Sequence, residues 1–104
     1  MKIGIDLTLV TRFSNLDEHF VERFLTEDEQ IIYKKVLDKN KKYFLAGRWA
    51  SKEAIFKALN NSDYLHYAIL NDKNGKPYVK DHPEIKISIS HDGDYAISMV
   101  IVED

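Results

Sequence analysis

The chain of 104 residues has the length of one small domain, residues 1–104, with one modest core, so a large ligand is expected at an edge or between subunits. It has no cysteine, which excludes disulfides, zinc–thiolate sites and cysteine nucleophiles, and it shows neither a leader nor an apolar run near the roughly 18 residues of a membrane span. The net charge of −2 argues against a general nucleic-acid binder, and together these properties predict a soluble, cytoplasmic protein.

The first part of the chain predicts a strand followed by two short helices. Residues 2–10 alternate between apolar and small or polar side chains, which is typical of a half-buried strand. Residues 15–24 carry apolar side chains at helical spacing. Thr26 and Glu29 then form a capping box, which predicts the start of a second helix that runs to about Leu37.

The segment 41–59 predicts the longest helix, because it contains no proline and only one glycine. Along it, alanine recurs at every fourth residue, at Ala46, Ala50, Ala54 and Ala58. Such a ridge of small side chains lets a helix backbone lie close against a sheet or another helix. Glu53 and Lys57 stand beside this ridge, so we expect acidic and basic groups at the border of the packed face.

The last part of the chain predicts short strands joined by turns. Residues 67–70 and 78–79 flank a strong turn signal, and residues 85–90 and 95–102 form a second pair around a polar turn. The order of strand, helices and further strands predicts an α+β fold with a largely antiparallel sheet.

Basic side chains gather in the middle of this acidic protein. Eight lysines and arginines lie from Lys34 to Lys57, against only Asp38 and Glu53. A local basic segment of this kind suggests a specific anionic partner, and a solvated helix face explains the same pattern.

Two carboxylates are candidate ligands for a hard cation. Asp6 lies in the middle of the first strand, on the side opposite Ile3 and Ile5, although aspartate is depleted in strands. Mg²⁺ takes one or two carboxylates and completes its shell with water and phosphate oxygens, so Asp6 and Glu53 could share such an ion. An aspartate on a wet sheet face and a Glu53–Lys57 pair on a helix surface remain the alternatives.

Three basic residues of the long helix are candidates for binding phosphate. Arg48, Lys52 and Lys57 combine a forked guanidinium with mobile ammonium groups, which suits a pyrophosphate and an additional phosphate. Catalysis of phosphoryl transfer depends mainly on positioning and on neutralising charge, and an array of this kind supplies both. A solvated basic face is the alternative here too.

Two turn regions offer polar rims rather than a catalytic triad. Ser90 and His91 end a strand, and we interpret them as a hydrogen-bonding rim for a phosphate or nucleotide, because triad members converge from separate parts of a fold. Gly75-Lys76-Pro77 is the exit of a turn. The chain has neither a Walker-type loop nor a GxGxxG motif, so a standard nucleotide cradle is not expected.

In their order along the chain, these segments resemble the holo-[acyl-carrier-protein] synthases, a family of 4′-phosphopantetheinyl transferases. The similar segments cover almost the whole chain, at residues 3–7, 20–29, 44–59, 75–77, 88–91 and 95–96. Most specific is the run Phe44 to Ala54, continuing to Lys57-Ala58-Leu59, which matches the family's hallmark helix almost residue for residue. The segment 20–29 is similar to the family's F-x-x-R-x-L-T-x-x-E signature.

The resemblance implies a Mg²⁺-dependent enzyme that moves 4′-phosphopantetheine from coenzyme A to a serine of apo acyl carrier protein and releases 3′,5′-ADP. It implies Asp6 and Glu53 as Mg²⁺ ligands and, with Lys57, as the catalytic residues. It further implies Arg48, Lys52 and Lys57 as coenzyme A phosphate contacts. For the serine proton the base is either water at the metal or a nearby carboxylate.

The resemblance also implies where the remaining contacts lie. Coenzyme A would be bordered by Gly75, Lys76, Pro77, Ser90 and His91, and acyl carrier protein would be contacted by Arg12. The family's sites lie between the subunits of a homotrimer.

Two departures from the family pattern concern the coenzyme A pocket. Residues 60–66 are shorter than the family's loop and lack its glycines, and Asp92 follows His91 where a hydroxyl residue is common. A non-catalytic module that binds carrier protein or nucleotide is therefore a second hypothesis, and a Mg²⁺-dependent phosphate-ester hydrolase is a third.

Overall fold

A computed structural model describes all 104 residues. The elements in chain order are β1 (Lys2–Leu9), the 3₁₀ turn η1 (Val10–Phe13), α1 (Glu18–Phe24), α2 (Glu27–Lys35), α3 (Asp38–Leu59), β2 (Ile69–Asn71), β3 (Pro77–Val79), β4 (Ile85–Asp92) and β5 (Tyr95–Val102). The predicted α+β fold is confirmed, and α3 begins a little earlier than the sequence predicted. None of the three helices combines the length and the apolar character needed to cross a membrane.

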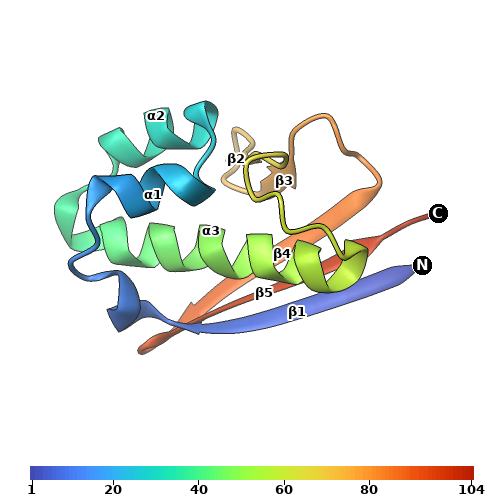
Figure 1. The fold of residues 1–104 in the computed structure, drawn as a ribbon, viewed down its shortest axis with the longest axis horizontal. Helices are drawn as coiled ribbons and strands as arrows, with labels where there is room; N and C mark the ends of the chain where they lie inside the picture. Colours follow the sequence, from blue (N-terminus) through green and yellow to red (C-terminus); the bar gives the residue numbers. More distant parts are fainter.

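An antiparallel sheet of three strands lies under α3, with the strands in the order β1-β5-β4 (Figure 1). Asp6 of β1 is paired with Ser98 of β5. The short strands β2 and β3 form a separate antiparallel pair, and Figure 1 shows this pair on the side of α3 away from β1. Helix α3 therefore stands between the first strand and the β2–β3 pair.

The core is built around the buried face of α3. Ala46, Ala50 and Ala54 are fully buried, so the predicted ridge of small side chains is the packed face of the helix. One hydrophobic cluster lies between the second half of α3 and strands β2 to β5, and another joins α1, η1 and the first half of α3. The capping box at the start of α2 is formed, with both Thr26 and Glu29 bonded as expected.

Strand β1 is half buried, but its buried side is the polar one. Gly4, Asp6 and Thr8 face α3, whereas Ile3, Ile5 and Leu7 are each at least half exposed. The cause is the close approach of the helix, since a β-carbon on Gly4 would lie 1.9 Å from the carbonyl oxygen of Ala54. Only the side of β1 that carries small and polar residues fits beneath α3.

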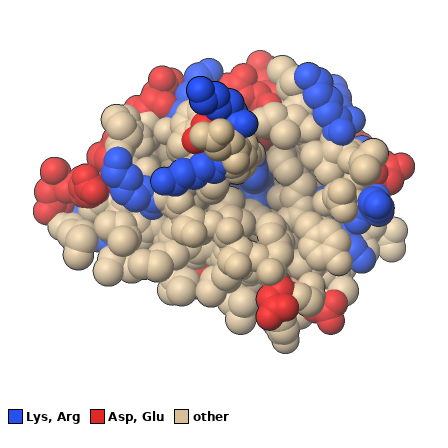
Figure 2. All heavy atoms as spheres, turned by 180° about the vertical axis from the view of Figure 1, so that it is seen from behind, with Lys and Arg blue, Asp and Glu red and all other residues tan.

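The outer face of the sheet is apolar and exposed. Besides the β1 residues, it carries Tyr95, Ile97 and Met99 of β5, which are 36–49% exposed. The strands run along the lower part of the molecule in Figure 1, and Figure 2 shows few charged side chains over the lower half of the opposite view.

Candidate active site

The contact between β1 and α3 brings Asp6 next to a lysine from the far end of the helix. The Lys57 ammonium donates hydrogen bonds to the carbonyl oxygen of Ile5 at 2.8 Å and to Asp6 Oδ1 at 3.3 Å. The hydroxyl of Thr8, two residues along the same face of β1, donates to Asp6 Oδ2 at 2.6 Å. The Asp6 carboxylate is thus oriented on both oxygens and lies beside a positive charge.

Glu53 lies one helical turn before Lys57 and is held by a residue from the following loop. The hydroxyl of Tyr64 donates a hydrogen bond to Glu53 Oε1 at 2.5 Å. Burial, this hydrogen bond and the negative charges of Glu53 and Asp6 raise the pKa of Tyr64 to about 12. Glu53 is thus in direct contact with the Tyr64 hydroxyl, and the charge of Asp6 acts on the same group from β1.

Two carboxylates and one lysine define what this region can bind. The structure contains no group of three or more histidine, aspartate or glutamate side chains that could enclose a metal ion. A pair of carboxylates instead suits a hard cation that takes its other ligands from water and from phosphate oxygens. Two carboxylates and a lysine are thus the donor set that such a cation and a phosphate would use here.

Arg48 points to the other side of α3. It precedes Lys57 by nine residues, about two and a half turns, which places the two side chains on opposite faces of the helix. Its guanidinium donates to Asn71 Oδ1 at the end of β2 and lies over the ring of Phe44, and its buried Nε has no partner. Burial lowers the pKa of Arg48, an effect that the charge of Glu29 partly opposes.

Lys52 is enclosed in the core, and the expectation that it binds phosphate is not met. Its ammonium donates to Glu29 Oε1 at 2.7 Å and to the carbonyl oxygens of Tyr64 and Tyr67 at 2.8 and 2.5 Å. All three donors are used, and the side chain is 0% exposed. Burial lowers the pKa of Lys52, although the neighbouring Glu29 carboxylate favours the charged form.

Glu29, the partner of Lys52, is a structural residue whose second role the sequence did not reveal. Besides closing the capping box, its carboxylate accepts hydrogen bonds from the backbone amide of Ile69 at 3.0 Å and from Lys52. It therefore ties α2 to α3 and to the start of β2.

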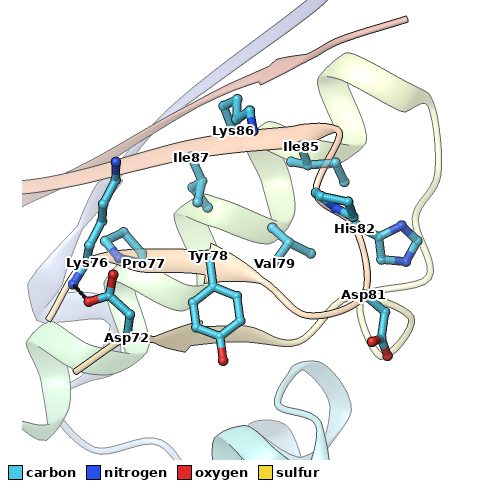
Figure 3. Close-up of a pocket in the computed structure, with 11 residues that line it drawn as sticks. Asp72, Lys76, Pro77, Tyr78, Val79, Asp81, His82, Ile85, Lys86 and Ile87 are labelled. Carbon is cyan, nitrogen blue, oxygen red and sulfur yellow. Dashed lines mark hydrogen bonds between the residues drawn. The ribbon is translucent and has the colours of Figure 1, made fainter. Parts of the chain in front are cut away.

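The residues assigned to the coenzyme A rim fall into two groups. Lys76 and Pro77 line a pocket of about 440 Å³ between β3 and β4, together with Tyr78, His82 and Lys86 (Figure 3). Gly75 adopts a φ of +86° in the turn that precedes this pocket, a conformation that favours glycine.

His91 and Ser90 lie near the end of β4, next to the first half of α3. His91 Nε2 is 3.0 Å from the carbonyl oxygen of Tyr43, and a β-carbon on Gly47 would lie 3.3 Å from the same nitrogen. Ser90, His91 and the following Asp92 are all exposed. Asp6 lies on β1 and Glu53 on α3, whereas the rim residues lie on β4 and at the start of β3. The chain thus places the two carboxylates and the rim on different elements.

Arg12 is exposed in η1, directly after β1. Its guanidinium lies 5.8 and 6.0 Å from the rings of Phe13 and Trp49. The side chain is thus supported by aromatic rings and open to a partner.

Two residues of the site were missed in the sequence. Thr8 shares the face of Asp6, and the period of two in β1 could have identified it. Tyr64 lies in a loop without periodicity, so no sequence pattern connects it to Glu53.

Comparisons with known proteins identify the family of the chain. The family model described as "4'-phosphopantetheinyl transferase superfamily" matches residues 2–100. A holo-[acyl-carrier-protein] synthase of Geobacillus sp. (strain WCH70) is 43% identical, over 97% of this chain and 94% of that protein. The holo-[acyl-carrier-protein] synthase of Bacillus subtilis (strain 168) is 34% identical, over 97% and 93%.

Solved structures show the same fold. The holo-(acyl-carrier-protein) synthase of Bacillus anthracis str. Ames, in complex with CoA (3',5'-ADP), superimposes with a TM-score of 0.89 at 34% identity, over 98% of this chain and 95% of that one. The enzyme of Helicobacter pylori in complex with coenzyme A gives a TM-score of 0.80 at 29% identity, over 97% and 99%. The resemblance inferred from the sequence is confirmed, and the chain belongs to the 4′-phosphopantetheinyl transferase superfamily, within the family of the holo-[acyl-carrier-protein] synthases.

Proposed function

We propose that this chain transfers the 4′-phosphopantetheine group from coenzyme A to a serine of apo acyl carrier protein. The relatives named above are holo-[acyl-carrier-protein] synthases, and two of the similar structures contain coenzyme A or 3',5'-ADP. The observation that carries the proposal is the hydrogen bond of Lys57 to Asp6 where β1 contacts α3, with Glu53 one helical turn before Lys57. We assign the reaction to the cytoplasm and to fatty acid biosynthesis, and the chain to one catalytic domain.

In this reaction the serine oxygen forms a bond to the phosphorus that carries pantetheine. The phosphoanhydride bond of coenzyme A breaks, and 3′,5′-ADP leaves with the electron pair. The serine proton must pass to a base. The Asp6 and Glu53 carboxylates are the side chains of this site that could accept it. Lys57 is half exposed and so is able to meet the oxygens of the transferring group, where negative charge increases.

Asp6 and Glu53 are the residues that would hold Mg²⁺. When bound, Mg²⁺ would neutralise the pyrophosphate and so allow it to approach two carboxylates. The chain's own part is to hold these carboxylates still, through Thr8 and Lys57 on Asp6 and through Tyr64 on Glu53.

A homotrimer with its sites between subunits would complete the arrangement. The apolar outer face of β1 and β5 is exposed in the single chain, which is unfavourable in water. The carboxylate pair and the rim of Ser90, His91 and Lys76 lie on different elements, so a neighbouring subunit could bring its rim to these carboxylates. Arg48 and its unpaired Nε would then belong to the rim side, and Arg12 would meet an acidic carrier protein.

Intact-mass spectrometry tests the transfer. Apo acyl carrier protein is incubated with this protein, coenzyme A and Mg²⁺, and a Glu53→Gln variant and an EDTA-treated sample run in parallel. We expect a serine-linked phosphopantetheine on the carrier protein, and its loss in both controls. If a folded protein and a competent carrier give no product, the catalytic proposal is wrong, and binding without turnover becomes the better description.

A mixing experiment tests the shared sites. Asp6→Asn and His91→Ala chains are each expected to be inactive, and co-refolding them is expected to restore part of the activity, because some sites then contain two intact halves. Activity that stays absent in a mixed oligomer would place each site within one subunit.

A further inference from the structure

One side chain outside the helix, Tyr64, is held by three residues of α3 at once. Trp49, Lys52 and Glu53 occupy positions i, i+3 and i+4 and therefore share one face of the helix. The Trp49 ring packs edge-on against the Tyr64 ring at 5.5 Å, the Lys52 ammonium binds the Tyr64 carbonyl oxygen, and Glu53 accepts the Tyr64 hydroxyl. Ring, backbone and hydroxyl are each fixed by a different residue.

The loop around Tyr64 is ordered by its own polar groups. The amide of Asp63 donates to Asn61 Oδ1, and the amides of Leu65 and His66 donate to the side chain and the carbonyl of Asp63. Lys52 also binds the carbonyl of Tyr67 beyond it. The position of the hydroxyl is therefore set by the loop and the core, and does not depend on Glu53 alone.

Glu53, by contrast, has few other restraints. It is half-buried on the border of α3, and Tyr64 is the only residue to which its carboxylate is hydrogen-bonded. A glutamate has several accessible rotamers, so an unrestrained side chain would lose conformational entropy each time it bound a cation. A hydroxyl that occupies Oε1 removes much of this freedom and leaves Oε2 without a protein partner.

We propose that Tyr64 is a positioning residue that holds the Glu53 carboxylate ready for a divalent cation, with Lys52 acting on the same carboxylate indirectly by fixing the Tyr64 backbone. The inference rests on the proposed function, since it requires Glu53 to be a cation ligand. Lys52, which is buried and does not reach a phosphate, would then act on the site by holding the Tyr64 backbone. Residues that orient ligands of a metal typically change its affinity by about 10–100-fold when they are lost.

The alternative is that Tyr64 only stabilises the loop. Tyr64→Phe separates the two, because the ring can still pack on Trp49 and the backbone carbonyl still meets Lys52. Tyr33→Phe is the matched control, since Tyr33 stacks on Phe44 and its hydroxyl makes no hydrogen bond to the chain.

The test measures binding of Mn²⁺ alone to the full-length protein, from the free Mn²⁺ signal in electron paramagnetic resonance. For Tyr64→Phe we expect the Kd for Mn²⁺ to rise about 10-fold. This is the lower end of the usual effect of losing a residue that hydrogen-bonds to a metal ligand. Binding should be lost in Glu53→Gln and unchanged in Tyr33→Phe. In turnover assays, the Mg²⁺ concentration for half-maximal rate should rise in Tyr64→Phe while kcat at saturating Mg²⁺ falls less.

Each contrary result has its own meaning. If Tyr64→Phe binds Mn²⁺ like the wild type while Glu53→Gln does not, the role of Tyr64 is overturned and the proposed function stands. If Glu53→Gln also binds normally, Glu53 is not a cation ligand, and both the metal assignment and this inference are wrong.

Discussion

The backbone of α3 rests directly on Gly4, with the carbonyl oxygen of Ala54 where a β-carbon of residue 4 would be, at 1.9 Å. This contact brings Glu53 and Lys57, the neighbours of Ala54 on the helix, to Asp6 on the strand. We therefore expect Gly4→Ala to displace the helix, to destabilise the fold by at least about 1–3 kcal/mol and to abolish turnover, because the obstacle is backbone that cannot move aside locally. Urea unfolding and the intact-mass assay measure the two effects. Gly47→Ala within α3 is the comparison, and its effect on the free energy of unfolding should be smaller, because helix propensity favours alanine by about 1 kcal/mol and the atoms nearest its β-carbon, at 3.3–3.4 Å, belong to the side chains of His91 and Ile89 and not to backbone.

The buried pair of Glu29 and Lys52 should be sensitive to the loss of one partner. Lys52→Met leaves the Glu29 charge in the core, and breaking a buried pair in this way costs about 3–5 kcal/mol of unfolding free energy. The double variant Glu29→Leu with Lys52→Met should lose less than the sum of the single variants. It should not recover fully, because the amides of Thr26 and Ile69 lose their acceptor. If Lys52→Met lowers the free energy of unfolding no more than the exposed Lys73→Met does, this account is wrong.

Lys57 should matter for turnover and little for stability. Its side chain is 52% exposed, so Lys57→Met should change the unfolding free energy by no more than about 0.5 kcal/mol. The rate of carrier-protein modification should fall by about 10²–10³-fold, the usual effect of removing a group that stabilises transition-state charge. Lys57→Arg keeps the charge and should retain more activity than Lys57→Met. Equal rates for Lys57→Met and the wild type would remove Lys57 from the mechanism.

The ion pair between Lys80 and Asp28 predicts a pH dependence at alkaline pH. The hydrogen bond to Asp28, and then its negative charge, raise the pKa of Lys80 in the folded protein. The stabilisation is fully present below the unfolded pKa of about 10.4 and is lost as the pH rises through the folded pKa. The urea midpoints of wild type and Lys80→Met should therefore differ at neutral pH and converge at alkaline pH, once the pH exceeds the raised pKa of Lys80. The difference should also shrink in 1 M salt, since both groups are at the surface. If the two urea midpoints move apart as the pH rises, the pKa of Lys80 is not raised in the folded protein.

The exposed face of the sheet predicts the effect of a charge on oligomerisation. Leu7 is 62% exposed in the single chain, so Leu7→Glu should leave the fold intact, as circular dichroism would show. If this face joins subunits, the variant should be monomeric by native mass spectrometry, because a charge would be buried in an apolar interface. Ile31→Glu places the same charge on α2, where the side chain is 56% exposed, and should not change the mass. A Leu7→Glu trimer, or a monomeric wild type, would contradict the proposed assembly.

The sequence predicted the elements well because their signals are local. The capping box of Thr26 and Glu29 and the alanine ridge each act within one or two turns of helix, and both are found as predicted. The side of β1 that is buried was not predictable by the same means. Alternation shows that a strand has two faces, but which face meets α3 depends on Gly4, whose small size matters only once the helix is in place.

The candidate site also contains residues that the sequence could predict and residues that it could not. Asp6 and Glu53 were proposed from residue type and family resemblance, and in the structure Lys57, one turn after Glu53 on α3, is hydrogen-bonded to Asp6. Lys52 was misassigned because adjacent helix residues differ by about 100° in direction, and composition alone does not tell which of two charged neighbours points inward. Tyr64 was missed because its loop has no repeating pattern.

The adjacency of Lys52 and Glu53 also limits how α3 can change over time. A single inserted or deleted residue between Phe44 and Ala50 would rotate the later half of the helix by about 100°. The Glu53 carboxylate would then turn relative to the core, the Lys52 ammonium would leave Glu29, and a bulky side chain would replace Ala54 above Gly4. No single substitution elsewhere could compensate for all three changes. The length of this helix should accordingly be much less tolerant of insertions than the loop at residues 72–76, where the chain turns in solvent.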